Sequence, residues 1–271
     1  MQISEDESGF LPEERRQQIV KILMAEGKVK VPNLAQRLKA SVDTIRRDLK
    51  ELENSGSLTR VHGGALPRSP ATNSYRVRQS QNRLAKEAIA IEACKLIQPN
   101  QVVFIDGGTT ALEVVRHLPI DIKLTIVTAS PPVMAVAAQY PFVQAIMLGG
   151  TLDPVSMTVI GGNALETLRQ IQADVCILGI CSLDIEFGVT TIGYEESKIK
   201  SLMVQNASEV VAVTTADKLG TAAPFKVASI DHLTHIVTES SAPKDKIDRF
   251  IDVDIEVVLG SSEQNVNRKK R

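Results

Sequence analysis

Residues 41–52 read Ser-Val-Asp-Thr-Ile-Arg-Arg-Asp-Leu-Lys-Glu-Leu, and their pattern is the clearest structural signal in the N-terminal part of the chain. Ser41 is a residue type that commonly caps a helix N-terminus, and Gly56 is a natural helix stop. Four apolar residues follow Ser41 at spacings that place them on one helical stripe: Val42, Ile45, Leu49 and Leu52. The stripe predicts a helix with an apolar inner face and a basic outer face.

Short elements flank this helix on both sides. Pro12 is placed to open an earlier helix that Gly27 would end, and a second short helix follows residues 31–33. The Gly-Gly pair at 63–64 separates two short extended runs, a pattern typical of a hairpin. Two helices across a tight turn, followed by a hairpin, predict a winged helix-turn-helix over residues 12–67.

The predicted outer face has the chemistry of a DNA-binding surface. In a helix-turn-helix the second helix enters the major groove, where Arg can bind guanine and Lys or Thr can bind phosphates. Residues 12–68 carry 12 Lys+Arg against 7 Asp+Glu, although the whole chain has a net charge of −1. A solvated helix face is the alternative, but it leaves this basic excess and the hairpin unexplained. The candidate DNA contacts are Ser41, Asp43, Thr44, Arg46, Arg47, Lys50, Arg60 and His62.

The rest of the chain has a different pattern. Residues 68–82 contain several Ser, Asn and Gln residues and few apolar ones, which is typical of a linker. Residues 83–260 alternate helical patterns with apolar runs, which predicts an α/β domain whose Rossmann-like, largely parallel sheet is covered on both faces. The predicted strands are 102–105, 124–128, 143–148, 175–180, 210–214, 235–237 and 255–259. Residues 261–271 predict a polar, basic tail.

One strand-to-helix turn in this domain has the composition of an anion-binding loop. Residues 102–110 read Val-Val-Phe-Ile-Asp-Gly-Gly-Thr-Thr. Glycines let the backbone approach a ligand closely, and the free N–H groups of a helix N-terminus together with two hydroxyls can bind an anion. Such turns lie at the carboxyl edge of a parallel sheet, where α/β domains bind ligands. A Gly-Gly turn that merely connects two elements is the alternative.

Both segments resemble the DeoR family of bacterial transcriptional repressors. The matching motifs are residues 41–49, Leu52, Gly56, Leu58, the run Arg60-Val61-His62-Gly63-Gly64-Ala65 and the Asp-x-Gly-Thr-Thr turn at 106–110. The resemblance implies a sugar-phosphate sensor with a fold like ribose-5-phosphate isomerase and the CoA transferases, in which Lys218 reaches the phosphate or a sugar oxygen. The effector-binding residues that it implies are Asp106, Gly107, Gly108, Thr109, Thr110, Thr128, Gly150, Glu195 and Lys218.

Three positions depart from the family's pattern. Ala129 stands where the family usually has Asn, and Cys181 stands where it usually has Gly. The carboxylate that usually lies ahead of the lysine comes two places later, at Asp217. These departures bear on which ligand the domain binds.

Composition excludes several classes of protein. No apolar run approaches the roughly 18 residues that span a bilayer, and the acidic start lacks the features of a secretion signal. The absence of Trp and an aromatic content of 3% exclude a stacking platform for single-stranded nucleic acid. No cluster has zinc-like spacing, so we expect neither a metal nor a cofactor. Cysteines in apolar runs predict buried, inert thiols at Cys94, Cys176 and Cys181.

These features together predict a cytoplasmic, DNA-binding transcriptional regulator without enzymatic activity. We expect it to bind double-stranded operator DNA as a homo-oligomer, a dimer or a tetramer, because one winged helix reads only a short site. We expect it to repress a carbohydrate-metabolism operon and to be released by a phosphorylated sugar. The alternatives are a sugar-phosphate isomerase-like enzyme with an accessory DNA-binding module and an architectural DNA-binding protein without an effector.

Overall fold

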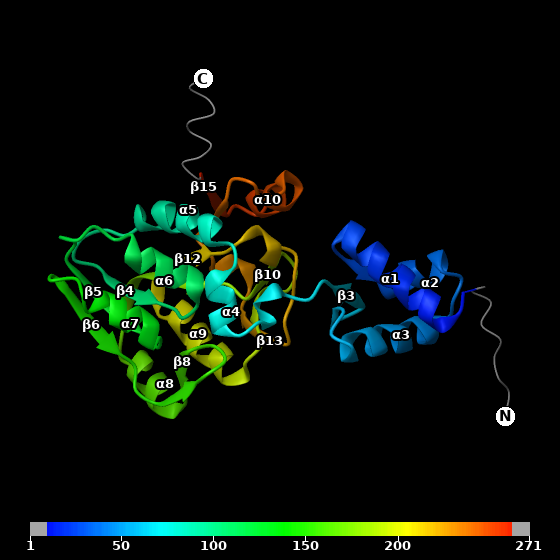
Figure 1. Ribbon diagram of the computed structural model, residues 1–271, viewed down its shortest axis with the longest axis horizontal. Coiled ribbons are helices and arrows are strands. Elements are labelled where there is room, and N and C mark those ends of the chain that lie inside the picture. Colours follow the sequence, from blue (N-terminus) through cyan, green and yellow to red (C-terminus); the bar gives the residue numbers. More distant parts are fainter. Residues whose placement is uncertain (1–9, 262–271) are drawn as a thin grey trace, which may run out of the picture.

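The computed structural model describes residues 10–261, which form two modules joined by a short segment (Figure 1). The N-terminal module, drawn in blue, lies at one end of the molecule, and the larger α/β domain lies at the other (Figure 1). No helix in the described part of the chain is long and apolar enough to cross a membrane.

The N-terminal module is a winged helix. Its three helices share one apolar core and are α1 (Pro12–Glu26), α2 (Val31–Arg37) and α3 (Val42–Asn54). Its three strands pair antiparallel in the order β1-β3-β2 and are β1 (Val29–Lys30), β2 (Thr59–Val61) and β3 (Gly64–Leu66). The β2–β3 hairpin forms the predicted wing.

The buried face of α3 differs from the predicted stripe in two places. Ile45 and Leu49 are buried as expected, but Val42 is 39% exposed, since the first turn of α3 borders the open space beside the wing. Asp48 is buried instead, where its carboxylate pairs with Arg15 of α1 at 2.5 Å between Oδ2 and Nε. An ion pair therefore joins α1 to α3 inside the module.

A seven-stranded parallel sheet forms the centre of the α/β domain. The strand order is β15-β14-β12-β9-β4-β5-β6, and every neighbouring pair is parallel. The strands are β4 (Val102–Ile105), β5 (Leu124–Thr128), β6 (Val143–Met147), β9 (Ala173–Gly179), β12 (Ala207–Val213), β14 (His235–Glu239) and β15 (Glu256–Gly260). All seven predicted strands are members of this sheet.

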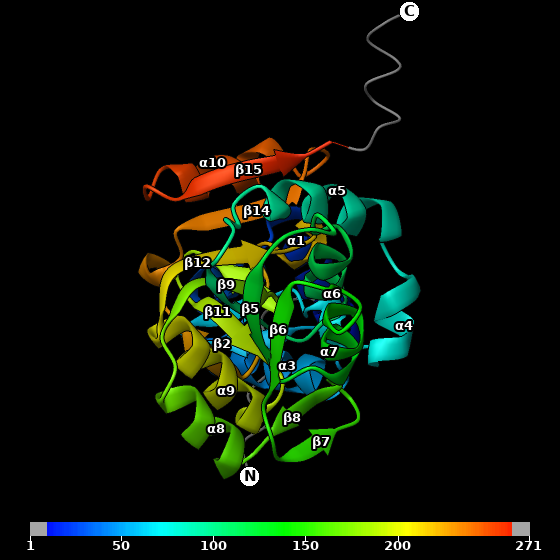
Figure 2. The same cartoon turned by 90° about the vertical axis from the view of Figure 1, so that its left-hand side faces the viewer.

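Helices cover both faces of the sheet (Figure 2). One apolar core lies between the sheet and α5 (Arg83–Cys94), α6 (Thr109–Arg116) and α7 (Pro131–Ala137). A second core lies on the opposite face, against α8 (Gly162–Arg169), α9 (Tyr194–Gln205) and α10 (Lys244–Ile251). The predicted two-sided α/β architecture is confirmed.

Short elements that the sequence did not predict decorate the sheet. A small antiparallel sheet contains β10 (Ser182–Asp184), β11 (Gly188–Thr191) and β13 (Phe225–Ala228). A hairpin contains β7 (Thr151–Asp153) and β8 (Thr158–Ile160). Single 3₁₀ turns are η2 (Ala216–Lys218) and η3 (Ile230–His232).

The segment 68–82 is folded against the α/β domain. It contains η1 (Pro70–Thr72) and the short helix α4 (Tyr75–Ser80). The hydroxyl of Ser69 donates a hydrogen bond to the carbonyl of Cys181, and the Tyr75 N–H donates to the Val155 carbonyl at 3.3 Å. Backbone and polar groups make these contacts, which is why the composition of the segment gave no sign of them.

One ion pair connects the two modules directly. Lys28, next to β1, contacts the carboxylate of Glu186 in the β10–β11 turn. The same ammonium group lies 5.2 Å from the ring centroid of Phe187. The winged helix therefore touches the α/β domain at a turn that follows β10.

Candidate functional site

Three neighbouring strands end at one pocket. The C-terminal ends of β4, β9 and β12 and the residues that follow them supply Gly107–Thr110, Gly179–Cys181 and Lys218, and these strands lie side by side in the sheet. Four more side chains complete the lining: Arg78, Ser156, Glu196 and Lys200. We call this the α6 pocket. Its position at the carboxyl edge of a parallel sheet is the position where α/β domains bind ligands.

The N-terminus of α6 forms one wall of the α6 pocket. Gly108 caps the helix with φ of +100°, a conformation that favours glycine. The loop is closely packed, because a Cβ on Gly107 would lie 2.1 Å from Thr158 Cγ2. The first N–H groups of a helix have no intrahelical acceptor, so this wall presents free donors at the positive end of the helix dipole.

Thr110 provides an independent sign that a ligand belongs here. Its hydroxyl is buried and has no hydrogen-bond partner among residues 10–261. Buried polar groups are ordinarily paired, and an unpaired one costs about 1–3 kcal/mol. Because Thr110 lines the α6 pocket, an acceptor atom of a bound molecule can satisfy this hydroxyl.

A buried ion pair supports the loop from below. Lys200 of α9 contacts the carboxylate of Asp106 and donates to the Gly179 carbonyl at 2.8 Å. Asp106 also accepts a hydrogen bond from the Gly179 N–H at 3.0 Å, while Glu196 lies 3.6 Å from Lys200. Although burial lowers the pKa of Lys200, the Asp106 and Glu196 carboxylates raise it above its ordinary value. The pair ties β4, β9 and α9 together under the pocket.

Cationic side chains lie around the mouth of the pocket. Burial lowers the pKa of Lys218 to about 8, and its ammonium group donates to the Ile180 carbonyl at 2.8 Å. Arg78 of α4 lines the α6 pocket and also an adjoining cavity that it shares with Thr109 and Lys218. Lys86 lies in that second cavity, and burial lowers its pKa to about 8. The arrangement favours an anion.

The structure brings together some of the expected effector residues and separates others. Five line the α6 pocket: Gly107, Gly108, Thr109, Thr110 and Lys218. Asp106 lies beneath the loop in the ion pair with Lys200.

The remaining three expected residues, like Asp106, lie outside the pocket lining. The Thr128 hydroxyl accepts a hydrogen bond from the Ser130 N–H, and Gly150 packs against the backbone of β8. Glu195 pairs with Lys198 on the surface of α9, at 2.9 Å. The neighbouring acidic residue Glu196, rather than Glu195, lines the α6 pocket.

Several pocket residues carry no clear signal in the sequence. Arg78 falls in the segment interpreted as a linker. Lys200 sits four positions after Glu196, a helical spacing that could have indicated an inward pair. Of the three cysteines expected to be buried, Cys176 is buried, whereas Cys94 and Cys181 are half-buried, and Cys181 lines the pocket.

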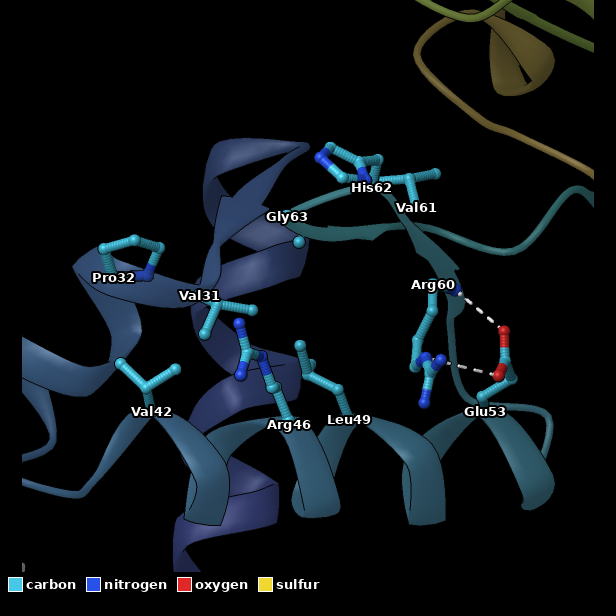
Figure 3. A pocket seen from close by; sticks show the side chains of 11 residues that line it. Val31, Pro32, Val42, Arg46, Leu49, Glu53, Arg60, Val61, His62 and Gly63 are labelled. Carbon is cyan, nitrogen blue, oxygen red and sulfur yellow. Dashed lines mark hydrogen bonds and ion pairs between the residues drawn. The ribbon is translucent and has the colours of Figure 1, made fainter.

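A second candidate site lies between α3 and the wing (Figure 3). A cavity of about 670 Å³ opens there, and we call it the α3–wing groove. Its lining contains apolar and cationic side chains: Val31, Pro32, Val42, Arg46, Leu49, Glu53, Arg60, Val61 and His62, with Gly63 and Gly64. In helix-turn-helix proteins the helix that corresponds to α3 is the one that enters the major groove of DNA.

The predicted DNA contacts fall into groups around this groove. Arg46, Arg60 and His62 line it. Arg47, Lys50 and Asp43 are exposed on α3, and Asp43 pairs with Arg46 at 3.2 Å. Ser41 and Thr44 are joined to each other, since the Ser41 hydroxyl caps α3 by accepting the Thr44 N–H at 3.0 Å.

Glu53 is a groove residue that the sequence did not single out. Its carboxylate accepts the backbone N–H of Arg60 at 3.0 Å and lies 3.5 Å from the Arg60 Nε (Figure 3). The last turn of α3 therefore holds the guanidinium group of the wing in place. No group of three or more His, Cys, Asp or Glu side chains in the described ranges is arranged to hold a metal ion.

Comparisons with known proteins agree with this organisation. Residues 15–70 match the DeoR-like helix-turn-helix domain, and residues 81–240 match the DeoR C terminal sensor domain. The HTH-type transcriptional regulator GlpR of Haloferax volcanii is 34% identical over 93% of this chain and 99% of its own length. The glycerol-3-phosphate regulon repressor of Escherichia coli is 29% identical over 91% of this chain and 98% of its own length.

Solved structures show more distant likenesses. Ribose 5-phosphate isomerase A of Methanocaldococcus jannaschii has a TM-score of 0.38 and 19% identity, over 51% of this chain and 55% of that one. The probable sor operon regulator of Shigella flexneri has a TM-score of 0.43 and 12% identity, over 62% of this chain and 91% of that one. Likenesses this distant carry no information about function. The two domain matches and the near full-length relatives show that the chain belongs to the DeoR family of helix-turn-helix transcriptional regulators.

Proposed function

We propose that this regulator represses a carbohydrate-metabolism operon and that a phosphorylated sugar bound in the α6 pocket releases it from double-stranded operator DNA. The observation that carries the proposal is the buried hydroxyl of Thr110 at the N-terminus of α6, which has no partner among the described residues and lines the same pocket as Arg78 and Lys218.

The chemistry of the α6 pocket suits a phosphate monoester. A phosphate carries close to two negative charges at neutral pH and three acceptor oxygens. The helix N-terminus supplies N–H donors, Thr109 and Thr110 supply hydroxyls, and Arg78 supplies a charged donor fork. The name of the E. coli relative, which refers to glycerol 3-phosphate, supports a phosphorylated polyol or sugar as the ligand.

The proposed regulator has two functional domains and acts as a homo-oligomer. We place the DNA-binding module at 12–67, the connecting segment at 68–82, the effector domain at 83–260 and a basic tail at 261–271, of which only residue 261 lies within the described residues. A homo-oligomer, a dimer or a tetramer, would present two winged helices to a two-fold symmetric operator. Such a regulator would act in the cytoplasm, where it meets DNA.

A thermal-shift screen tests the ligand class. The purified chain is heated with a panel of phosphorylated sugars and polyols, with the unphosphorylated compounds and with inorganic phosphate. A ligand at 100 times its Kd stabilises the folded state by about 2.7 kcal/mol, which gives a clear rise in Tm. We expect at least one phosphorylated compound to raise Tm while its unphosphorylated counterpart does not.

Two variants localise the effect to the α6 pocket. Arg78→Ala removes a cation that lines the pocket, whereas Arg76→Ala removes an exposed cation from the same helix. We expect the first to lose most of the ligand-induced Tm rise and the second to keep it. If no phosphorylated compound stabilises the chain, or if both variants respond like the wild type, the proposed effector site is wrong.

A further inference from the structure

The position of Val42 is unusual for an apolar side chain. Val42 is the first residue of α3, and it remains 39% exposed although the sequence places it on the apolar stripe. Its side chain lines the α3–wing groove one turn before Arg46, which also points into the groove (Figure 3). An exposed methyl-bearing group therefore lies on the groove side of the helix rather than in the core.

The α3–wing groove combines an apolar floor with cationic side chains along its length. Val31, Leu49 and Val61 line it as apolar residues. Arg46 lies one turn after Val42, whereas Arg60 lies at the other end of the groove, beside Glu53 (Figure 3). An apolar floor disfavours a lone anion or water, whereas the two cations attract the phosphate backbone of DNA. The groove is therefore suited to a DNA strand whose bases present a methyl group and whose phosphates flank it.

Other side chains near the start of α3 already have partners. Ser41 and Thr44 are joined in the helix cap, and the Asp43 carboxylate pairs with Arg46. The N-terminal residues of a recognition helix are nearest to the base edges, and thymine is the base that presents a C5-methyl group in the major groove. This leaves Val42 as the apolar group in the position that meets a base.

We propose that Val42 is a specificity-determining residue that recognises the 5-methyl group of a thymine. Glu53 has a separate role as a positioning residue, because its carboxylate holds the neighbouring Arg60. The proposal rests on the proposed DNA binding and names the base that one part of the groove selects. Contact between an apolar side chain and this methyl excludes water from both, which favours thymine over a pyrimidine without the methyl.

Removal of the methyl group alone provides the test. A duplex is first selected with the wild-type chain from a random-sequence pool, and each thymine is then replaced in turn by deoxyuridine. This exchange removes one methyl and leaves the base pairing intact. Burial of one such carbon is worth about a four-fold change in affinity. We expect a loss of this size at one thymine in each half-site.

Variants assign the methyl contact to its residue. Val42→Ala should lower affinity for the thymine duplex by several-fold and abolish the difference between thymine and deoxyuridine at that position. Val253→Ala is the matched control, because Val253 is 42% exposed and lies in the α/β domain, and it should keep the full difference. Unchanged thermal unfolding of Val42→Ala would show that the fold is intact.

The outcomes separate this inference from the function on which it rests. If no duplex is enriched, the DNA-binding proposal itself fails. If a duplex binds tightly but no deoxyuridine replacement weakens it, or if Val42→Ala keeps the full thymine preference, the role of Val42 is overturned while DNA binding stands. For Glu53, Glu53→Gln should weaken binding to all duplexes as Arg60→Ala does, and an unchanged affinity would remove its positioning role.

Discussion

Lys200 and Asp106 form an ion pair in which both side chains are almost completely buried, directly beneath the loop that opens α6. The loop can hold its donors toward a ligand only if the strand end below it is fixed, and this pair fixes it to α9. Arg78 and Lys218 lie at the pocket surface, where they remain available to an anion.

Removal of Lys200 should destabilise the α/β domain strongly. Lys200→Met leaves the Asp106 carboxylate buried without its partner, and loss of one member of a buried pair costs about 3–5 kcal/mol. Urea unfolding measures the change. Lys198→Met breaks only an exposed, solvent-screened pair with Glu195, so the free energy of unfolding should change far less than in Lys200→Met. Equal effects for the two variants would mean that the buried pair does not support the loop.

Arg47 and Arg60 should contribute to DNA binding in different ways. Arg47 is exposed on α3, so Arg47→Ala should weaken binding to the selected duplex by about 1–3 kcal/mol with little effect on unrelated DNA. Arg60→Ala should weaken binding to all sequences alike and reduce the salt slope by about 1. Fluorescence anisotropy at several salt concentrations distinguishes these outcomes. If Arg47→Ala binds the selected duplex like the wild type, Arg47 does not contact bases.

A carboxylate at the start of α6 should produce a repressor that no longer responds. Thr109→Asp or Thr110→Asp places a negative charge where the phosphate belongs and removes a hydroxyl donor. Effector binding should be abolished while DNA binding survives, because the winged helix is untouched. In a reporter strain these variants should repress in the presence of the inducing sugar. A normal response to that sugar would rule out this loop as the phosphate site.

Effector affinity should fall as the pH rises through about 8. Burial, with Arg78 and Lys86 nearby, lowers the pKa of Lys218 to about 8, while Asp217 and Cys181 oppose this shift. Lys218 therefore loses its charge between about pH 7 and pH 9, whereas a phosphate monoester stays dianionic because its second pKa is about 6. Calorimetric titration across this range measures the loss.

The lowered pKa of Lys218 has the opposite effect on folding stability: as the pH rises, effector affinity falls but the free energy of unfolding increases. A lysine whose pKa is lowered in the folded chain binds fewer protons when folded than when unfolded between about pH 8 and pH 10.5. This group therefore makes the free energy of unfolding rise with pH in that window. Lys218→Gln should remove its share of both trends. Lys86 has a similarly lowered pKa, so Lys86→Gln is measured beside it. Effector affinity that is constant from pH 7 to pH 9 would show that Lys218 does not bind the anion.

Much of the fold could be predicted from apolar patterns. Each of the seven strands of the central sheet contains a short run of apolar residues, since a parallel sheet is buried on both faces. The small sheet of β10, β11 and β13 was missed, because its strands are only three or four residues long and β13 is remote in the chain from its partner β11. Val42 was placed inside because the stripe alone does not show where the neighbouring helices end.

The candidate site was only partly predictable for a related reason. The turn at 106–110 is local, so its glycines and threonines could be recognised in the sequence. Arg78 comes from α4, and Glu196 and Lys200 come from α9; only the tertiary fold brings these two helices to the loop after β4. Glu195 was selected instead of Glu196 because a motif fixes a region of a helix, whereas the direction of each side chain depends on how the helix packs.

The most direct test of the account is the affinity for the selected duplex, measured by anisotropy with and without the phosphorylated sugar that stabilises the chain. A ligand changes DNA affinity only if it binds the free and DNA-bound arrangements differently. We expect the phosphorylated sugar to weaken binding by about 5- to 150-fold, equivalent to a coupling of about 1–3 kcal/mol, and its unphosphorylated counterpart to have no effect. An affinity that is unchanged or strengthened by the phosphorylated sugar would contradict the account of a repressor released by this ligand.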